Sequence, residues 1–469
     1  MTDAPTGAPV TPAARPTAAA RPRRSPTEFD VPFANATSGA LIATILHEPD
    51  WLTQDRAGGL AMFRALPVET NQLYTTYVDL RNADLSGVQP ALPGINVGRE
   101  PRPPAPALPD GVAAIIELDE GGLVGAAMGA EAQAAGLILE TLAQFGTRDP
   151  DGFRAAIERD GALPHDDKFA QLTRTFWSAG VHVAVPRGAR LEQPIVLRWS
   201  LSGPFALLSR TIVELGEDAE LKVVEELKPG SGPDAVGLYT GTTEVRIGAG
   251  SNLSFSSLQE LSAAQVAFQH RTAAIGSNAH LHWALAQLGT RLVRSRVDNR
   301  LEGDGGSVEQ VEIVFGSADQ LFDLTSYTRH LGRNATSNLL SKAALQGSAR
   351  TFLKGLVTIE KSATGTDSFL GEYGMNLSKK ARAVAIPSLE IDQPDCRRVA
   401  HSSSVGPIDE SQLFYLESRG IPAEDARKFI VLGFLEPVVA RVPLESARER
   451  LRELLEAKWD AAHEGPAAA

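Results

Sequence analysis

Cysteine is almost absent from this chain, which has 469 residues and a single cysteine, Cys396. One cysteine cannot form a disulfide within the chain, and so low a content is typical of proteins from a reducing compartment such as the cytoplasm. The chain also lacks the cysteines to hold zinc or an iron–sulfur cluster through four thiolates. A cluster bound here would therefore need histidine or carboxylate ligands, or ligands from a partner.

Several features of enzymes, membrane proteins and nucleic-acid-binding proteins are also missing. No apolar run reaches the ~18 residues that a membrane-spanning helix needs. The GxxxxGK[ST], GxSxG and HExxH motifs do not occur, so we expect no ATP hydrolysis and no other enzyme activity from this chain. The net charge of −12 repels phosphate backbones. These absences predict a non-enzymatic protein that binds neither membranes nor nucleic acid.

Composition and periodicity divide the chain into four parts. The N-terminal residues are rich in Ala, Pro, Thr and Arg and lack the apolar stretch of a secretory signal. Apolar residues at helical spacing in 37–66 and 130–160 flank a stretch, 84–110, that holds seven prolines. Helical spacing returns after about Asp409. The predicted parts are a disordered tail (1–27), an N-terminal helical region with a proline-rich linker (28–165), a β-helix core (166–405) and a C-terminal helical domain (406–469).

A recurring unit marks the middle of the chain, between about residues 169 and 391. It appears as Val213–Leu221, returns as Val245–Leu253 and returns again as Ala273–Leu281. Each copy has alternating apolar residues, then a glycine such as Gly216, and then a small residue. We expect the glycine to form a corner with positive φ, because glycine adopts that conformation readily. Stacked copies bury the apolar face that one copy leaves exposed, so the repeat predicts a β-solenoid rather than the alternative, a β-sandwich.

Two groups of side chains are candidates for binding a metal. The segment Pro394–His401 holds the only cysteine, a histidine and two arginines, and lies where the β pattern gives way to helix. Thiolate and imidazole both ligate iron, and we expect the arginines to favour the thiolate. His280 and His282 stand two apart on a predicted strand and so face the same side. They form either a metal-binding pair or part of one wet face of a sheet.

Several short motifs follow one another along the chain. Towards the C-terminus they include Leu389-Glu-Ile391, the run His401-Ser-Ser-Ser-Val-Gly406, and Asp409–Leu416. Upstream, Val185-Pro-Arg-Gly188 and Phe352-Leu-Lys-Gly355 fit the same series. In this order the motifs resemble the SufB/SufD family of SUF iron–sulfur cluster assembly proteins, and within it SufD, over roughly residues 45–460.

The resemblance implies a fold and a role. The fold is a right-handed parallel β-helix between N-terminal and C-terminal helical regions. The role is that of a scaffold subunit in the SufBCD complex, which pairs with SufB through the β-helices and is bound by the ATPase SufC through its C-terminal helical domain. A homodimer remains open for the isolated subunit. No cofactor would be held stably by this chain alone, and a transient iron–sulfur cluster would form at the SufB–SufD interface.

The resemblance also selects residues for the site of the nascent cluster. His401, in the HSSSVG run, matches the family histidine of SufD that faces SufB, and is the best candidate. Cys396 fits less well, because the family places its cysteine two residues before this histidine, where Val399 stands here. Glu436, in Gly433-Phe-Leu-Glu-Pro437, has a SufB-like setting. It is either a cluster-side carboxylate or a surface residue at a helix end.

Two other functions stay open. One is a SufB paralogue that itself acts as the cluster scaffold, but a SufB is expected to carry a sulfur-accepting cysteine in its core strands, and residues 1–395 contain none. The other is a β-helix enzyme acting on polysaccharides, which needs converging carboxylates. Asp298, Asp304, Asp319 and Asp323 are available for that, although aspartate is common at solvated corners.

Overall fold

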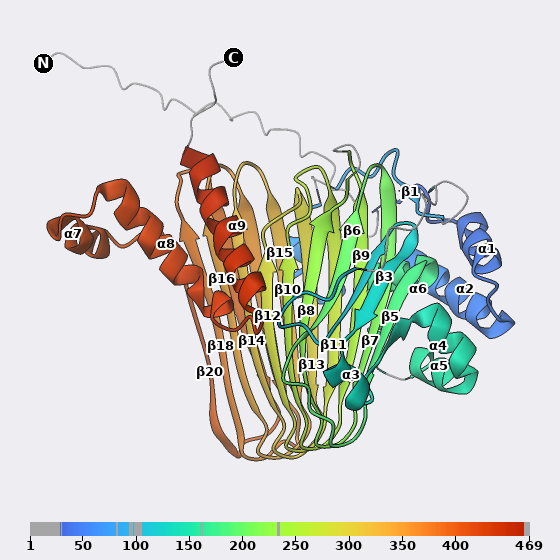
Figure 1. Cartoon of the computed structure of the whole chain (residues 1–469). Coiled ribbons are helices and arrows are strands. Elements are labelled where there is room, and N and C mark those ends of the chain that lie inside the picture. The colour runs from blue at the N-terminus through green and yellow to red at the C-terminus, as the bar shows by residue number, and fades with distance from the viewer. Residues whose placement is uncertain are drawn as a thin grey trace, which may run out of the picture.

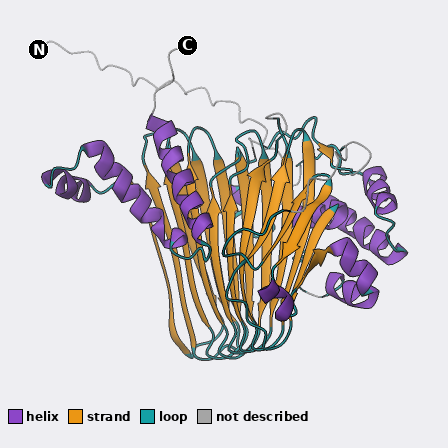
Figure 2. Ribbon diagram, in the orientation of Figure 1, coloured by secondary structure: helices purple, strands orange, loops and turns teal. Residues whose placement is uncertain are grey.

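A computed structural model describes residues 29, 31–80, 83–92, 97, 106–159, 161, 163–231 and 235–463. The tail predicted at 1–27 and the prolines at 101–104 lie outside these residues. Figure 1 shows a tall stack of strands with N-terminal helices against one side and C-terminal helices against another. The predicted fold class is confirmed, because the chain is mainly strand and forms a β-solenoid with helices before and after it, as Figure 2 also shows.

The solenoid consists of two parallel sheets whose inner faces enclose the main core. Strands alternate between the sheets, so each coil of the chain gives one strand to each. The first sheet carries β5 (Ala179–Val185), β7 (Phe205–Leu215), β9 (Leu238–Ile247), β11 (Val266–Ile275), β13 (Leu292–Leu301), β15 (Leu321–His330), β17 (Arg350–Ile359) and β19 (Arg382–Ile391). The second carries β6 (Ile195–Leu201), β8 (Glu220–Pro229), β10 (Asn252–Gln259), β12 (His280–Gln287), β14 (Ser307–Gly316), β16 (Thr336–Leu345), β18 (Thr366–Asn376) and β20 (Cys396–Gly406).

The register of the sheets confirms the repeat read from the sequence. Ala206 pairs with Leu238, 32 residues further on, and Val266 pairs with Leu292, 26 residues further on. Every pairing between successive coils is parallel, which excludes the antiparallel β-sandwich. Because paired residues in parallel strands point to the same side of the sheet, side chains stack in straight rows from coil to coil.

The corner glycines have a different role from the one predicted. Positive φ is found two residues after each of them, at Asp218 (56°), Gly250 (70°) and Asn278 (51°), and not at the glycines themselves. At Gly248 a Cβ atom would lie 2.7 Å from the backbone carbonyl carbon of Gly216, one coil away. Glycine is therefore needed because successive corners touch through their backbones. The small residue three positions after each glycine is buried.

A polar cluster interrupts the apolar interior of the solenoid. Arg271 of the first sheet reaches Glu225 of the second at 2.7 Å, and both side chains are 2% exposed. Ser257 bridges them, because it accepts a hydrogen bond from the guanidinium at 2.9 Å and donates one to the carboxylate at 2.7 Å. Since a buried charge is tolerated only when it is paired, this cluster joins the two sheets as a unit.

The N-terminal region contains strands as well as the predicted helices. The predicted helix over 37–66 is two helices, and the one over 130–160 is interrupted by a strand that pairs antiparallel with β5. Most of these helices pack against the outer face of the first sheet, through residues such as Phe169 and Phe176, whereas Ala132 of α3 joins the inner core. The helices are α1 (Ala36–Ile45), α2 (Asp50–Ala65), η1 (Thr75–Tyr77), α3 (Ala130–Ala134), α4 (Leu142–Arg148), α5 (Pro150–Ile157) and α6 (Lys168–Phe176), and the strands are β1 (Gln89–Pro90), β2 (Ala114–Asp119), β3 (Gly122–Met128) and β4 (Ile138–Thr141).

The C-terminal helices are α7 (Glu410–Ser418), α8 (Ala423–Val439) and α9 (Glu445–His463). The second half of α8 and most of α9 pack on the outer face of the second sheet, where Leu435 and Leu451 are fully buried. In contrast, α7 and the start of α8 project away from the solenoid beyond β20 (Figure 1). Among the described helices, none is both long and apolar enough to span a membrane.

Candidate functional site at the open end of the solenoid

The last coil of the solenoid has free edges. Strands β19 and β20 end the two sheets, and no strand in the described part of the chain pairs with their outer edges. We call these edges, with the side chains that face inward beside them, the open end. Ile391 of β19 is 49% exposed and Val405 of β20 is 41% exposed, although both continue rows that are buried in earlier coils. The open end therefore exposes side chains of an interior type.

His401 lies at the open end and faces the interior side of β20. It pairs with Leu370 of β18, which is 1% exposed. The same row runs back through buried side chains on the preceding strands of the sheet, namely Leu339, Gln310 and Trp283. His401 itself is exposed because no further coil covers it. This imidazole is therefore exposed at the open end, where a second protein can reach it.

Cys396 is the first residue of the same strand, but it does not lie beside His401. It pairs with Thr366, whereas His401 pairs with Leu370, so the two are four pairings apart. At about 3.3 Å per residue this places their backbones about 13 Å apart along the strand. The thiol is half-buried and donates to the carbonyl oxygen of Gln393 at 3.2 Å. The two residues therefore cannot hold one metal ion in this arrangement.

The expectation that the neighbouring arginines favour the thiolate is wrong. Arg397 donates to the carbonyl oxygen of Gly365 at 3.0 Å, and Arg398 pairs with Asp367 at 2.8 Å. Both cations are thus engaged with the preceding coil. Burial, together with the charge of Asp395, raises the pKa of the Cys396 thiol. The structure therefore favours the neutral thiol.

Glu436 lies on α8 and away from His401. Its carboxylate is 3.4 Å from Arg452 of α9 and is about half exposed. Two residues earlier in α8, the carbonyl oxygen of Phe434 accepts a hydrogen bond from Lys342 of β16 at 3.0 Å. This part of α8 therefore covers β16 on the outer face of the sheet, whereas His401 faces the interior side. Throughout the described chain, no three His, Cys, Asp or Glu side chains are arranged to hold a metal ion.

Glu372 is a buried carboxyl group near the open end that the sequence reasoning missed. It faces inward on β18, next to the row of His401, and is 1% exposed. It accepts a hydrogen bond from the backbone N–H of Ile386 at 2.8 Å. Burial raises the pKa of Glu372 to about 8. A signal was present in the sequence, because alternation from Ser368 and Leu370 places position 372 on the inner face.

The central part of the chain matches a known family model. Residues 199–434, from β6 into α8, match the model for the SUF system FeS cluster assembly SufBD core domain. The chain belongs to the SufBD family. The matched part of this SufBD family member includes the open end and His401.

Three curated relatives agree with this assignment. The iron–sulfur cluster assembly protein SufD of Bacillus subtilis is 28% identical over 303 residues, which are 64% of this chain and 69% of that protein. An iron–sulfur cluster assembly SufBD family protein of Mycobacterium bovis is 31% identical over 310 residues, 63% of this chain and 75% of that protein. SufB of Bacillus subtilis is 27% identical over 292 residues, 62% of each chain. The family-level prediction is confirmed, and the chain is a SUF-system subunit of iron–sulfur cluster assembly.

Proposed function

We propose that this chain is the SufD-type, non-enzymatic scaffold subunit of a SUF complex, and that it pairs with a SufB subunit through its open end. The observation that carries the proposal is the last coil, where β19 and β20 have free edges and His401 stands exposed in an otherwise buried row. A free parallel edge offers unpaired backbone groups to the edge of a second β-solenoid. A paralogue with the same strand spacing is the partner that fits this edge best.

Cysteine content supports a SufD-type rather than a SufB-type assignment. The identities to the SufD and SufB of Bacillus subtilis, 28% and 27%, do not separate the two. However, a SufB-type subunit is expected to carry a sulfur-accepting cysteine in its core strands. The one cysteine here, Cys396, begins the last of these strands, and burial raises the pKa of its thiol, which disfavours the thiolate that accepts sulfur. We therefore assign the sulfur-accepting step to the partner, in a reducing compartment that we propose to be the cytoplasm.

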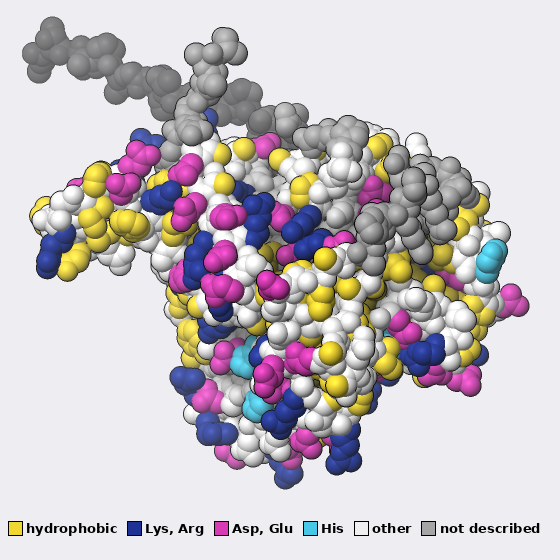
Figure 3. All heavy atoms as spheres, in the orientation of Figure 1, with side chains coloured by type: hydrophobic (Ala, Val, Ile, Leu, Met, Phe, Trp, Pro, Cys, Tyr) yellow, Lys and Arg dark blue, Asp and Glu magenta, His cyan; other side chains and the backbone are white. Residues whose placement is uncertain are grey.

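The projecting helices support a docking role for the C-terminal domain. Phe414 and Tyr415 of α7 are 70% and 57% exposed, and Phe429 of α8 is 58% exposed. Figure 3 shows hydrophobic side chains gathered on this projecting arm. Exposed aromatic side chains on an arm that stands clear of the core are typical of a protein-binding surface. We propose that the arm binds the SufC ATPase, which supplies the nucleotide site that this chain's sequence lacks.

His401 is the residue of this chain that we propose as a ligand of the transient cluster. Neutral imidazole binds iron, and the open end leaves this ring accessible to a partner's ligands. Cys396, about 13 Å along the strand, and Glu436, on the other face of the sheet, would reach the same cluster only if the chain rearranged. The remaining ligands would then come from SufB.

Co-expression with SufB and SufC tests the proposal. We expect a native mass that contains this chain together with both partners, and loss of SufB when Val405→Lys places a charge in the open end. The proposal would be contradicted if SufB and SufC formed a complex that excludes this chain although all three proteins are expressed. It would also be contradicted if the Val405→Lys variant still bound SufB as strongly as the unsubstituted chain does.

A second experiment isolates the proposed ligand. His401→Ala should lower the rate of cluster formation on the assembled complex by about tenfold or more, because a ligand is lost. Ser402→Ala, on the outward-facing side of the same strand, is the matched control and should keep the normal rate. Equal rates in the two variants would remove His401 from the site.

A further inference from the structure

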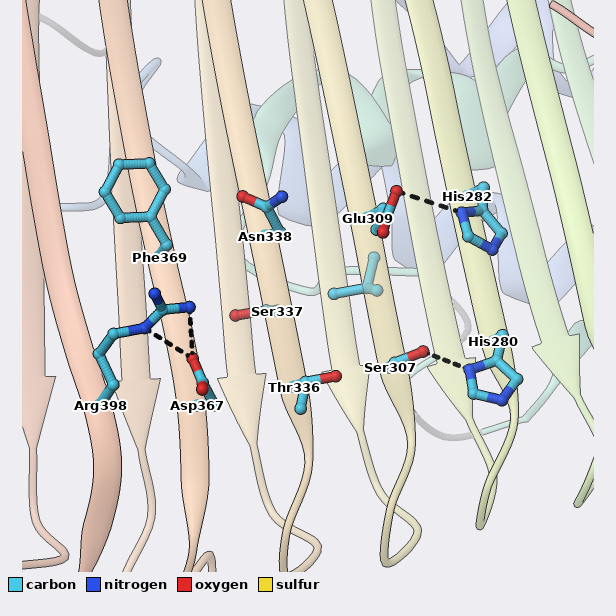
Figure 4. Close-up of a pocket in the computed structure, with 11 residues that line it drawn as sticks. His280, His282, Ser307, Glu309, Thr336, Ser337, Asn338, Asp367, Phe369 and Arg398 are labelled. Carbon is cyan, nitrogen blue, oxygen red and sulfur yellow. Dashed lines mark hydrogen bonds and ion pairs between the residues drawn. The ribbon is translucent and has the colours of Figure 1, made fainter. Parts of the chain in front are cut away.

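A groove on the outer face of the second sheet holds a pair of histidines that the proposed function does not use. It has a volume of about 630 Å³ and runs across β12, β14, β16, β18 and β20. Figure 4 shows His280 and His282 at one end of it, and Asp367 and Arg398 at the other. This face of the sheet is opposite to the side on which His401 continues the interior row.

The two histidines lie on the same face of β12. They are residues i and i+2 of one strand, so their side chains point to the same side, about 6.6 Å apart at their backbones. In the neighbouring strand β14, Ser307 pairs with His280 and Glu309 pairs with His282. Each imidazole therefore has one polar partner directly beside it.

The same ring nitrogen is engaged in both histidines. The Nδ1 atom of His280 is 2.5 Å from the hydroxyl oxygen of Ser307, and the Nδ1 atom of His282 is 3.6 Å from the carboxylate of Glu309. Among the described residues, neither Nε2 atom has a hydrogen-bonding partner. With Nδ1–H directed at β14, each Nε2 keeps its lone pair free for a ligand, on the side of the ring away from Ser307 and Glu309 (Figure 4). Metal-binding histidines are commonly oriented in this way by a carboxylate or hydroxyl on their other nitrogen.

We propose that His280 and His282 bind one divalent first-row transition-metal cation through their Nε2 atoms, with Glu309 as the residue that positions His282. Imidazole nitrogen is a ligand for zinc, copper, nickel and ferrous iron, whereas calcium and magnesium prefer oxygen. The site has two protein ligands, which agrees with the lack of any three-residue cluster in the described chain. Water or a second molecule fills the remaining positions, so the cation is exchangeable and not structural.

Other charged groups near the two histidines affect how tightly they bind the cation. Arg441, in the link between α8 and α9, lies 3.7 Å from the Glu309 carboxylate and competes with His282 for it. At the far end of the groove Asp367 is already paired with Arg398 at 2.8 Å. Removal of the competing cation with Arg441→Ala should therefore tighten metal binding, and Glu309→Gln should weaken it by about tenfold.

The experiment is a titration of the full chain with Zn²⁺ in competition with a chromogenic chelator. We expect one site with a 1:1 stoichiometry that disappears in His280→Ala and in His282→Ala. The matched control is His47→Asn, because His47 is an exposed histidine without a second histidine two residues away, and its positive φ of 52° suits asparagine. This control should bind as the unsubstituted chain does.

Two results of the zinc titration would overturn the proposal. One is Zn²⁺ binding that survives in both His280→Ala and His282→Ala, and the other is an equal loss in His47→Asn. Because both histidines are at least partly exposed, the variants should keep their unfolding midpoints, which circular dichroism checks. The spectrum of bound Cu²⁺ in electron paramagnetic resonance gives an independent reading on the unsubstituted chain. Coupling to two imidazole nitrogens supports the site, and coupling to one or none contradicts it.

Discussion

The two ends of the solenoid differ in how they finish their sheets. At the N-terminal end the first sheet ends in the short antiparallel strand β4 and the second in the antiparallel pair β2 and β3. Val181 and Val183 of β5, next to that end, are fully buried. At the C-terminal end, β19 and β20 are long, parallel and, in the described part of the chain, unpaired on their outer edges. Their inward side chains range from half-buried, on most of β19, to exposed.

This difference separates an end of the solenoid that is closed from an end whose strand edges stay available for pairing. Short antiparallel edge strands with helices beside them are a common protection against pairing with another chain. A long parallel edge without such protection continues the geometry of the stack, so its unpaired backbone groups can hydrogen-bond to the edge of another solenoid. The closed coils should therefore respond to substitution through folding stability, whereas the open end should respond through assembly.

The largest expected effect is in the closed coils, at the buried pair of Arg271 and Glu225. Arg271→Ala should lower the free energy of unfolding by about 3–5 kcal/mol, because it leaves the carboxylate buried without its partner. The double variant Arg271→Met with Glu225→Gln should lose much less, since it removes both charges. Denaturant unfolding measures both, and a single variant as stable as the unsubstituted chain would show that the interior is not closed.

Corner glycines give a smaller effect and a direct contrast between the two regions. Gly248→Ala should cost about 1–3 kcal/mol, because its Cβ would meet the backbone of the neighbouring corner. Gly406→Ala, at the end of β20, should change stability by less than about 0.5 kcal/mol, because nothing lies within 4 Å of its added carbon. Similar unfolding midpoints for the two variants would argue against the difference between closed and open coils.

Glu372 predicts a pH dependence of stability near the open end. In the folded protein burial raises its pKa to about 8, whereas a glutamate in an unfolded chain titrates near ~4.3. Between these values the folded protein keeps a proton that the unfolded chain has released, so stability should fall as the pH rises from about 4.3 to about 8. Glu372→Gln should reduce this slope and still accept the Ile386 N–H. Parallel slopes for variant and unsubstituted chain would show that the carboxyl is ionised in the fold.

The smallest effect on stability is expected at the open end. Val405→Lys should change the free energy of unfolding of the isolated chain by less than about 0.5 kcal/mol, because the side chain is 41% exposed. The same substitution should weaken pairing with SufB. A stability loss above 1 kcal/mol in the isolated chain would mean that this edge is already packed.

The solenoid could be predicted from the sequence because each coil repeats one local pattern of alternating apolar residues and a corner. The role of the corner glycine could not, because Gly248 is constrained by contact with the next corner and not by its own φ. The strand β4 was missed since its four residues lie inside an alanine- and leucine-rich segment typical of helix. Local sequence patterns therefore predict the fold of one coil, but not the contacts between neighbouring coils that constrain its residues.

The candidate site was harder to predict for the same reason. The position of His401 near the end of the core could be predicted, but its exposure depends on which strand is last in the stack, and its role as a cluster ligand stays a prediction. The protonation state of the Cys396 thiol was predicted wrongly, because the arginines beside it in sequence bind the preceding coil. Glu372 requires the inner face to be known before its burial can be recognised.

Hydrogen exchange of this chain, measured with and without SufB, tests most directly whether the open end is the docking surface. We expect amides of β19 and β20 to exchange rapidly in the isolated chain and to become protected when SufB is added, while β5 and β7 are protected in both states. Protection by SufB that appears on the N-terminal strands or helices, and leaves β19 and β20 unchanged, would contradict it.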